Sequence, residues 1–425
     1  MSDSLSALER SVLGHLDEDA LVESLVDLVR IPSVGGSDAE VEVQEHVGSV
    51  LRDLDTDVDQ WDIDLDELAD DPWFPGVEVE RSRAVGIVGT TEGDGPPGLV
   101  LSGHTDVVPA GDVETWGGSD PFSAEIRNNE LHGRGACDMK AGVAVNLAVV
   151  RTLRAAGVRL ERPLAVHSVI GEEDGGLGAF ATLRRGHRGD ACVITEPTSA
   201  QMVTATAGAL TFRIEVIGRS SHGSLRREGV SAFELFLPIH QALVELETER
   251  NKDVDRDFVS DLPYALSFGV VQSGVWSSNV PDKLVAEGRF GVRIDEDPRT
   301  ARMLFEDVVA EVAARDAWLQ EHRPVVTWPG GQFASGWLDD DHPLITETSD
   351  AVAAAGGARI PPNVAGVYGS DLRLYTGIGG VPTLHYGPGN MRLAHTPVER
   401  VDLDEVAQVA RALLVLTLRR CGVRA

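Results

Sequence analysis

Residues 98–112, GLVLSGHTDVVPAGD, join an apolar run typical of a buried strand to a polar turn that begins at His104. Other short apolar runs, bounded by glycine, proline or charged residues, lie at 84–91, 163–171 and 191–196. Apolar residues at helical spacing separate these runs over 139–157 and 177–186. Strands that alternate with helices predict an α/β domain with a helix-covered, mostly parallel sheet. In such sheets ligands bind beyond the carboxyl ends of the strands.

The pattern changes near residue 208. Residues 211–218, TFRIEVIG, alternate polar and apolar side chains with the period of two that is typical of a half-buried strand. Two helical and three further strand-like segments follow, at 230–250, 302–319, 264–274, 284–294 and 323–328. This block predicts an antiparallel sheet with two helices on one face. We therefore expect an α+β domain at 208–327, inserted into a larger domain formed by 1–207 and 328–425.

The charge of the chain limits its partners. The 425 residues favour two domains and carry a formal net charge of −31, with only three lysines, Lys140, Lys252 and Lys283. So acidic a surface repels nucleic acids and anionic membranes, and neither is an expected partner. It also stays soluble where salt screens charges over only about 3 Å, so we hypothesise a high-salt cytoplasm. The acidic stretch 53–71 is expected to be a surface excursion near the site.

The sequence also bears on the compartment. No apolar run reaches the roughly 18–20 residues that span a bilayer, and the acidic, amphipathic residues 1–34 do not resemble a secretory signal. Cys137, Cys192 and Cys421 show no paired spacing, which predicts a reducing, cytoplasmic location rather than a disulfide framework. Cys137 has no base spaced to activate it, so we expect it to be a small buried residue.

Histidines and carboxylates placed singly after the predicted strands are the candidates for chemistry, yet each has an ordinary interpretation. His104 alone is more often a structural hydrogen-bonding group, and Asp138 could cap the helix that follows it. Glu172 and Glu173 could be solvated loop acids in so acidic a protein. The same interpretation, as polar residues of surface loops, applies to Glu196, His222 and His395.

In combination these residues match what two divalent metal ions require, namely imidazoles and carboxylates on loops at one edge of a sheet. A metal removes the cost of burying adjacent acids such as Glu172 and Glu173. A carboxylate such as that of Asp138 has two oxygens and can bridge two ions. Asp106 is spaced to accept the second N–H group of a metal-bound His104. We therefore predict a two-metal hydrolase.

The order of five motifs supports a resemblance to a known family. These motifs are HTD at 104–106, GRGACDMKAG at 133–142, GEE at 171–173, TEPT at 195–198 and AHTPVER at 394–400. From RIPSV at 30–34 to its last helix, the chain closely resembles the dinuclear zinc aminoacylase and carboxypeptidase family, which includes acetylornithine deacetylase and succinyl-diaminopimelate desuccinylase. The resemblance implies a zinc-exopeptidase-like catalytic domain with a mixed sheet and an inserted lid domain used for dimerisation.

The family pattern assigns the metal ligands. It implies one metal held by His104 and Glu196, a second held by Glu173 and His395, and a bridge supplied by Asp138. It also implies that Asp106 orients His104 and that the peptide bond after Asp138 is cis. Glu172 is the implied general base, which activates the water between the two ions and passes the proton to the leaving amine. Zinc is the expected metal, with cobalt and manganese as alternatives that these donors accept.

The resemblance also implies residues that bind the substrate, in the inserted lid domain and in one further loop. The motif SSHGS implies that His222 reaches the partner's active site in a homodimer and stabilises the oxyanion. Arg293 and Asn279 match segments that hold the substrate carboxylate, although SSNVPDK is one residue shorter than the family's Asn-x-x-Pro. The loop GVYGSDLRLY adds the pocket candidates Ser370, Asp371 and Arg373.

The implied reaction is hydrolysis of the amide bond of an N-acyl amino acid, as in a deacetylase or desuccinylase. A metallo-dipeptidase or carboxypeptidase is the alternative within the same chemistry, so the expected ligand is a small N-acyl amino acid or a dipeptide. A non-catalytic binding protein of the same fold is a further alternative. The complete set of five ligands and Glu172 argues against it.

Overall fold

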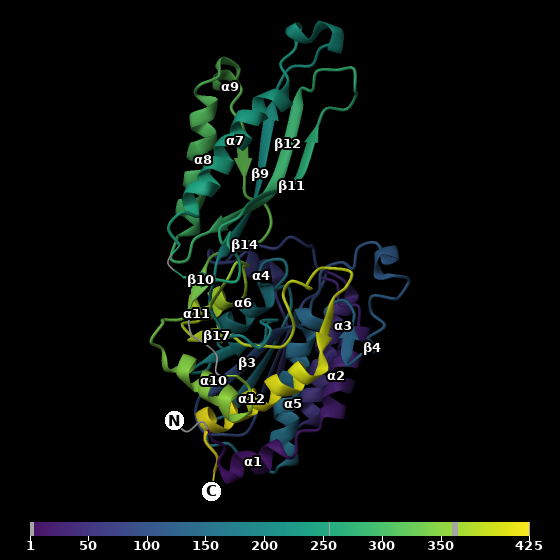
Figure 1. The fold of residues 1–425 in the computed structure, drawn as a ribbon, viewed down its shortest axis with the longest axis vertical. Helices are drawn as coiled ribbons and strands as arrows, with labels where there is room; N and C mark the ends of the chain where they lie inside the picture. The colour runs from purple at the N-terminus through teal and green to yellow at the C-terminus, as the bar shows by residue number, and fades with distance from the viewer. Residues whose placement is uncertain (1–3, 255, 359–363, 425) are drawn as a thin grey trace. The chain divides into compact units, whose positions relative to one another are not determined.

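The computed structural model describes residues 4–254, 256–358 and 364–424 (Figure 1). The chain divides into two compact units. The first unit comprises Met1–Ala205, Trp337–Val364 and Asp371–Ala425, and the second comprises Thr206–Gly336 and Ala365–Ser370. The inserted domain was expected at 208–327, and the second unit also contains 206–207, 328–336 and the short segment 365–370.

The first unit is built on a mixed sheet whose central strands are parallel. Four strands run parallel in the order β6 (Leu164–Val169), β3 (Leu99–His104), β7 (Cys192–Ile194) and β17 (Thr383–His385). Antiparallel strands flank them, β2 (Val85–Thr90) and β1 (Asp57–Asp62) on one side and β8 (Val203–Thr206) on the other. The expected fold class is confirmed, with parallel pairing confined to the centre.

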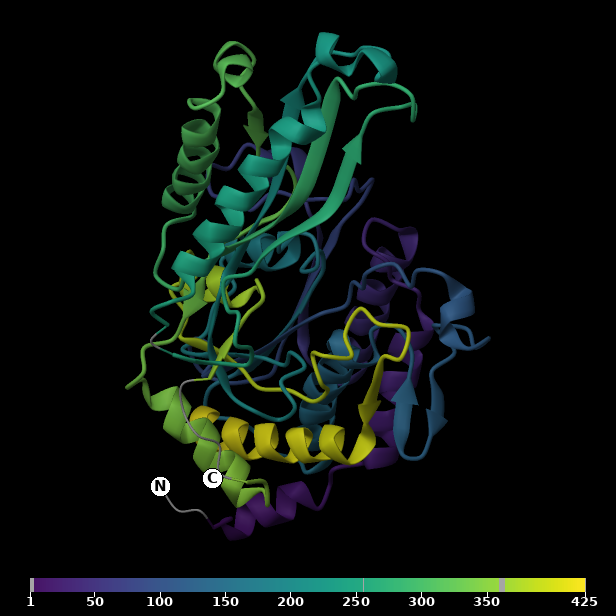
Figure 2. The ribbon, with the colours of Figure 1, turned by 45° about the horizontal axis from the view of Figure 1, so that its top comes forward.

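Helices cover both faces of this sheet. Leu99 and Leu101 of β3 belong to the core formed with α2 (Glu18–Arg30), α3 (Asp38–Asp53), α5 (Ala141–Ala155) and α12 (Leu403–Cys421). Val100 points to the opposite face, where it packs in a cluster with α6 (Leu177–Arg184) and α11 (Leu372–Thr376). Figure 2 shows α12 lying beside α10 (Pro343–Ala354). Burial on both faces explains why β3 is a continuous apolar run.

The acidic stretch expected to be a surface excursion instead contributes a strand. Asp57–Asp62 forms β1, which pairs with β2 in antiparallel register at the edge of the sheet. Charged side chains suit an edge strand because they oppose pairing with other chains. Asp59 forms an ion pair with Arg185, 2.7 Å between Oδ2 and Nε. The expectation was wrong for these six residues, because their charged side chains hid a strand whose apolar residues, Val58 and Trp61, do not alternate.

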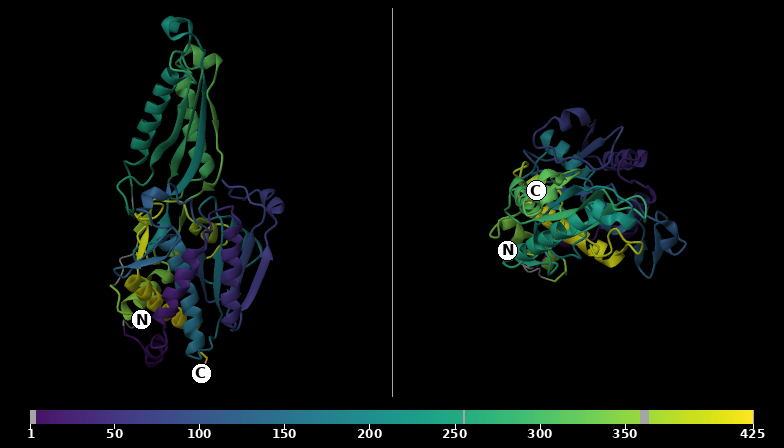
Figure 3. Two further views of the ribbon diagram at one scale, coloured as in Figure 1. Left: turned by 90° about the vertical axis from the view of Figure 1, so that its right-hand side faces the viewer. Right: turned by 90° about the horizontal axis from the view of Figure 1, so that it is seen from above.

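The second unit contains an antiparallel sheet in the order β11 (Leu266–Ser273), β12 (Lys283–Val292), β9 (Gly208–Ile217) and β13 (Val325–Thr327). The helix α7 (Ala232–Arg250) packs along these strands and beside α8 (Pro298–Ala313), as Figure 3 shows. The single helix expected over 302–319 is two helices, because α8 ends at Ala313. The side chain of Asp316 then caps α9 (Ala317–Glu321), accepting N–H groups of Trp318 and Leu319 at 2.8 and 3.0 Å.

A small three-stranded sheet in the first unit joins distant segments. Its order is β18 (Arg400–Asp402), β5 (Glu130–His132) and β4 (Glu125–Arg127). The other short elements are α1 (Ala7–Leu13), α4 (Leu65–Ala69), β10 (Asp257–Phe258), β14 (Gln332–Phe333), β15 (Gly336–Trp337) and β16 (Val364–Gly366). The three cysteines are buried and free. Within the described residues, no helix has both the length and the apolar character needed to cross a membrane.

Candidate active site

Four of the predicted site residues follow neighbouring parallel strands. His104 is the last residue of β3, Glu172 and Glu173 come after the end of β6, and Glu196 comes after the end of β7. Because β6, β3 and β7 are adjacent and parallel, their carboxyl ends meet at one edge of the sheet. The sheet therefore brings together side chains that are up to 92 positions apart in the sequence, from His104 to Glu196.

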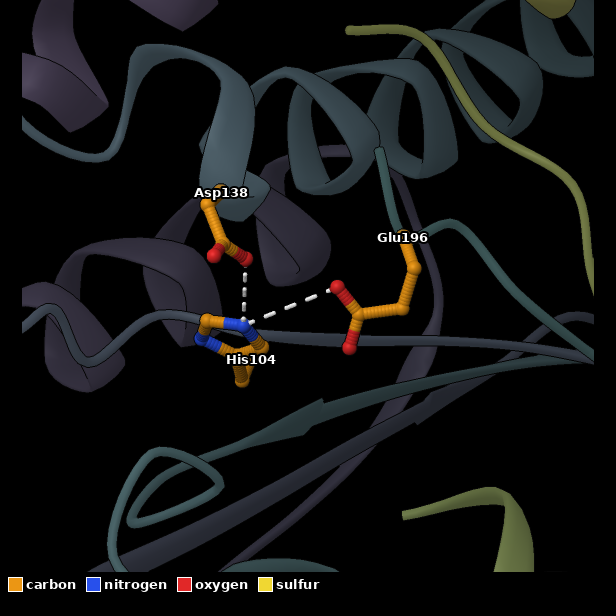
Figure 4. A group of neighbouring side chains, drawn as sticks. All are labelled: His104, Asp138 and Glu196. Atoms are coloured by element: carbon orange, nitrogen blue, oxygen red, sulfur yellow. Dashed lines mark hydrogen bonds and ion pairs between the residues drawn. The ribbon is translucent and has the colours of Figure 1, made fainter. Parts of the chain in front are cut away.

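His104, Asp138 and Glu196 form the first of two groups that could hold a metal ion. Nε2 of His104 lies 3.2 Å from Oδ1 of Asp138 and 3.8 Å from Oε2 of Glu196 (Figure 4). Asp138 lies in the turn Ala136–Lys140 that leads into α5, and its peptide bond to Met139 is cis, as the resemblance implies. The three side chains are buried, so one nitrogen and two carboxylates converge in the interior of the first unit.

The second group consists of Asp138, Glu173 and His395. Nε2 of His395 lies 3.0 Å from Oε1 of Glu173 and 3.4 Å from Oδ2 of Asp138. Asp138 therefore presents Oδ1 to the first group and Oδ2 to the second. This is the arrangement that a carboxylate needs in order to bridge two metal ions.

The main chain of Asp106 orients the ring of His104. Nδ1 of His104 lies 2.9 Å from the carbonyl oxygen of Asp106, which can only accept a hydrogen bond. Nδ1 is therefore the donor, and Nε2 is left to face the carboxylates of the first group. The nearer carboxylate oxygen of Asp106 is 3.6 Å from Nδ1.

The carboxylate of Asp106 instead contacts the loop after β6. It accepts the main-chain N–H groups of Glu172 and Glu173, at 3.3 and 3.2 Å. Hydrogen bonds to an ionised carboxylate are stronger than those between neutral groups. Asp106 therefore holds the two adjacent acids as well as the histidine.

The two groups concentrate negative charge in a buried place. Burial raises the pKa of the Glu196 and Glu173 carboxyls, and the neighbouring Asp138 carboxylate raises both further. Hydrogen bonds to Asp138 and Glu173 raise the pKa of His395 to about 10. Such a cluster keeps its carboxylates ionised when positive charge compensates them. Imidazole nitrogens with carboxylate oxygens are donors that zinc, cobalt and manganese accept, so the site fits divalent metal ions.

Glu172 belongs to neither metal group but lies beside them. It is buried, and burial together with the charge of Glu196 raises its pKa well above the usual value. A carboxyl group with a raised pKa next to a metal site can take a proton and return it near neutral pH. Its burial and its charged neighbours are what a general base at such a site needs, so Glu172 is the candidate for that role.

Asp371 and Arg373, at the start of α11, contact the loop 171–176 that carries Glu172 and Glu173, which we call the acid loop. Both are buried, and Nη2 of Arg373 donates a hydrogen bond to the carbonyl oxygen of Gly175 at 2.7 Å. A Cβ atom at Gly176 would come within 2.6 Å of Oδ1 of Asp371, which leaves room only for glycine there. Burial raises the pKa of Asp371 to about 6. These two pocket candidates therefore lie against the loop that carries Glu172.

The remaining candidates belong to the second unit. His222 and Asn279 are exposed and pair across an isolated antiparallel bridge, so the structure brings these two together. Arg293 follows the last residue of β12, whereas Asn279 precedes the first, so the two lie at opposite ends of that strand. Arg293 donates to the carbonyl oxygen of Asp253 at 2.9 Å. Ser370 is buried.

Arg81, whose side chain is 2% exposed, is a further charged residue that no sequence pattern indicated. Its guanidinium donates to both oxygens of Glu40, at 2.8 and 2.9 Å, and to both oxygens of Asp174, at 2.8 and 3.0 Å. Asp174 directly follows Glu172 and Glu173 in the acid loop. Neither periodicity nor a motif distinguishes this arginine, because its partners lie 41 and 93 positions away.

Lys140 ties the turn that carries Asp138 to α2. Its buried Nζ donates to the carbonyl oxygens of Leu28 and Ile31 at 2.9 and 2.7 Å, at the end of that helix. Burial lowers the pKa of Lys140 to about 7. A cation at a helix C-terminus complements the exposed carbonyl groups there. Its place in the motif at 133–142 and the scarcity of lysine in the sequence are the signals that could have pointed to this residue.

Two metal-competent groups and a buried carboxylate at the strand ends of a mixed α/β sheet define a metal-dependent hydrolase. The family model described as peptidase family M20/M25/M40 matches residues 100–419. The chain belongs to peptidase family M20/M25/M40, and the predicted family resemblance is confirmed.

Relatives and solved structures agree with this membership. The chain is 26% identical over 444 aligned residues to the N-formyl-4-amino-5-aminomethyl-2-methylpyrimidine deformylase of Bacillus subtilis, covering 99% of each chain. It is 33% identical to a succinyl-diaminopimelate desuccinylase of Stenotrophomonas maltophilia, covering 74% of this chain and 82% of that one. The fold resembles that of the di-peptidase Dug1p from Saccharomyces cerevisiae, with a TM-score of 0.74, 14% identity and 99% of each chain covered.

Proposed function

We propose that this protein hydrolyses the amide bond of a small N-acyl compound, with N-acyl amino acids as the substrate class, and uses two divalent metal ions. The observation that carries the proposal is the placement of Asp138, which presents one oxygen to each of two metal-competent groups beside the buried Glu172. The relatives named as a deformylase and a desuccinylase support deacylation over peptide cleavage.

The proposed ligand sets follow the two groups. His104, Glu196 and Asp138 would hold one ion, and Glu173, His395 and Asp138 would hold the other. When bound, the ions polarise the scissile carbonyl group and lower the pKa of the attacking water. We propose zinc as the metal, with cobalt and manganese as the alternatives to compare.

Glu172 performs the proton transfers of the proposed reaction. Its carboxylate takes a proton from the attacking water as the new C–O bond forms, and it then donates that proton to the leaving nitrogen as the C–N bond breaks. The products are a carboxylic acid and an amine. Asp106 keeps Glu172 in place through its hydrogen bond to the main chain, so the base stays aimed while it titrates.

We further propose a homodimer formed through the second unit. In the described sheet of that unit β11 is an edge strand, and it carries the exposed apolar residues Val270 and Val271. Val275 and Trp276, in the loop after it, are 94% and 70% exposed. An exposed apolar edge strand favours pairing with another chain. Trp276→Glu should convert the dimer to a monomer in light-scattering measurements, and a wild type that is monomeric would contradict the proposal.

The dimer gives His222 its proposed role in the partner's active site, where it stabilises the oxyanion. Arg293 and Asn279, the proposed carboxylate-binding residues, lie at opposite ends of β12, so one substrate meets both only if they come from different chains. Mixing inactive Glu172→Ala and His222→Ala proteins, after subunit exchange, should restore activity in heterodimers. Persistent inactivity of exchanged heterodimers would argue that His222 acts within its own chain.

The net charge of −31 and the buried free cysteines support a cytoplasmic location at high salt. Unfolding by urea in increasing KCl tests the salt dependence. We expect stability to rise toward molar KCl, because screening relieves the repulsion between acidic side chains. A protein that is most stable at low salt would contradict this part of the proposal.

A substrate panel tests the proposed reaction. The panel contains N-formyl, N-acetyl and N-succinyl amino acids, an N-formyl aminomethylpyrimidine and dipeptides, assayed at high salt with zinc or cobalt. Hydrolysis of N-acyl amino acids with two ions bound per chain is the expected result, and Glu172→Gln is the matched inactive control. Cleavage of dipeptides alone, or no hydrolysis by protein that holds two ions, would overturn the proposal.

A further inference from the structure

Glu399 connects the two segments that carry Asp138 and His395. It lies four residues after His395 and is 1% exposed. Its Oε1 accepts the main-chain N–H groups of Cys137 and Asp138, each at 3.2 Å. One side chain is therefore bonded to the main chain of Asp138 and joined by a short segment to His395.

The main chain around Asp138 needs this acceptor. Asp138 departs from helical geometry, with φ −115° and ψ 94°, and α5 begins only at Ala141. The N–H groups before a helix lack partners within it and must find them elsewhere. A buried N–H group left without a partner costs about 1–3 kcal/mol. The carboxylate of Glu399 satisfies two of them at once.

The small sheet places Glu399 where it can do this. Arg400 of β18 pairs with His132 of β5 in antiparallel register. One residue further along, the carbonyl oxygen of Glu399 accepts the N–H group of Gly133 at 3.1 Å. The pairing therefore continues past the end of the strands and delivers the side chain of Glu399 to the turn at 136–140.

Arg134 balances the charge of Glu399. The two side chains form an ion pair, and both are almost completely buried. The guanidinium of Arg134 also lies 5.4 Å above the ring of Trp116. A buried ion pair commonly stabilises a protein no more than apolar residues of the same size. A gain in stability is therefore a weak reason to bury this ion pair. The hydrogen bond that Glu399 accepts from the main chain of Asp138 is a better one.

We propose that Glu399, paired with Arg134, is a positioning residue that sets the placement of Asp138 relative to His395 and thereby the affinity for the second metal ion. The proposal rests on the two-metal function proposed above. Both oxygens of Asp138 are used, so a shift of its main chain changes both ligand groups. The side chain of His395 is 51% exposed, which leaves the second group with less packing to resist such a shift.

The test compares zinc binding in wild type and Glu399→Gln, measured by competition with a chromophoric chelator. Glutamine keeps one oxygen that can accept a hydrogen bond but carries no charge, so it forms no ion pair with Arg134. We expect one of the two zinc ions to bind about 10- to 100-fold more weakly, with kcat lowered and KM unchanged. The control is Glu9→Gln, because Glu9 is also a buried glutamate paired with an arginine, Arg419. The control should lose stability but keep both zinc affinities and kcat.

Wild-type zinc affinity and kcat in Glu399→Gln would overturn the proposal. If that variant does not fold, the double variant Glu399→Met with Arg134→Met replaces the ion pair with apolar residues of similar length. The double variant should show the same loss of zinc affinity, and wild-type affinity in it would again overturn the proposal. A wild-type protein that binds no zinc, cobalt or manganese would instead contradict the two-metal function itself.

Discussion

The carboxylate of Asp106 accepts the main-chain N–H group of Glu172 at 3.3 Å, while the carbonyl oxygen of the same residue accepts from Nδ1 of His104 at 2.9 Å. One residue thus joins the histidine at the end of β3 to the acid loop after β6. Its side chain and its main chain serve different parts of the site. This division of roles predicts a specific phenotype.

Replacing Asp106 by Ala should lower kcat about 10- to 100-fold while two metal ions remain bound. The substitution removes the acceptor for the N–H groups of Glu172 and Glu173 but leaves the carbonyl group that orients His104. Metal content by mass spectrometry and steady-state kinetics check this together. Loss of one ion would show that the carboxylate, rather than the main chain, orients the imidazole.

Replacing Glu172 by Gln should keep both ions and lower kcat by about 10²–10⁴, the usual contribution of a general base. Glutamine has the same shape and keeps the main-chain hydrogen bond to Asp106 but cannot take a proton. The comparison is kcat and metal content against wild type. Full activity in this variant would mean that another group moves the proton.

Replacing Asp138 by Ala should remove metal and activity together, because both ligand groups lose an oxygen. Asp138→Asn is a milder substitution at the same position. It keeps one carbonyl oxygen, so this variant should retain one ion more tightly than the other. Titration with zinc against a chelator separates the two steps. Two tightly held ions in the alanine variant would refute the bridge.

Replacing Arg81 by Met should destabilise the protein strongly, by about 3–5 kcal/mol, because it leaves Glu40 and Asp174 buried without their cation. Arg83 offers a matched control two residues away. It also pairs with two acids, Glu45 and Asp62, but its side chain is 48% exposed, so Arg83→Met should change stability little. Urea denaturation midpoints compare the two. Equal effects would show that burial does not set the strength of the Arg81 contacts.

Stability should fall as the pH drops below about 6.5, in part because of His167. Burial lowers its pKa to about 3, while Nδ1 lies 2.9 Å from the hydroxyl of Tyr375. As the pH falls, this histidine takes up a proton in the unfolded chain before it does so in the folded protein. Its contribution to stability is therefore fully present above about pH 6.5 and is lost as the pH falls toward 3. The loss amounts to about 1.4 kcal/mol per pH unit for each such histidine. Burial also lowers the pKa of His385 to about 3, so this histidine changes the stability in the same direction.

The variant His167→Gln tests this linkage. Its urea stability, measured between pH 7 and 5, should depend on pH less steeply than that of wild type. His15→Gln is the control, because His15 is exposed on the surface. Parallel pH profiles for wild type and His167→Gln would show that this histidine is not the source of the acid sensitivity.

Local patterns predicted most of the elements because periodicity is a property of neighbouring residues. The run at 98–104 became β3, and the helical spacing at 139–157 became α5. The pattern failed where local chemistry competed with it. Charge obscured the edge strand β1, and the cap at Asp316 split one expected helix into two.

The supporting residues of the site could not be predicted in the same way. Arg81 and Glu399 act through partners that are 41 to 265 positions away, and no spacing rule relates them. For Asp106 the sequence predicted the contact with His104 but not the atom that makes it. Its position beside His104 was evident, but the choice between carbonyl and carboxylate as the acceptor depends on how the turn folds.

The sequence by itself determined the fold class, the family and the residues that follow the strand ends. Strand and helix periods and motif order depend only on the types and the order of residues along the chain. The tertiary structure decided which oxygen of Asp138 faces which group, which part of Asp106 holds His104, and which buried acids hold the main chain. These choices depend on the convergence of segments from 104 to 399, and only the packed sheet brings those segments within hydrogen-bonding distance.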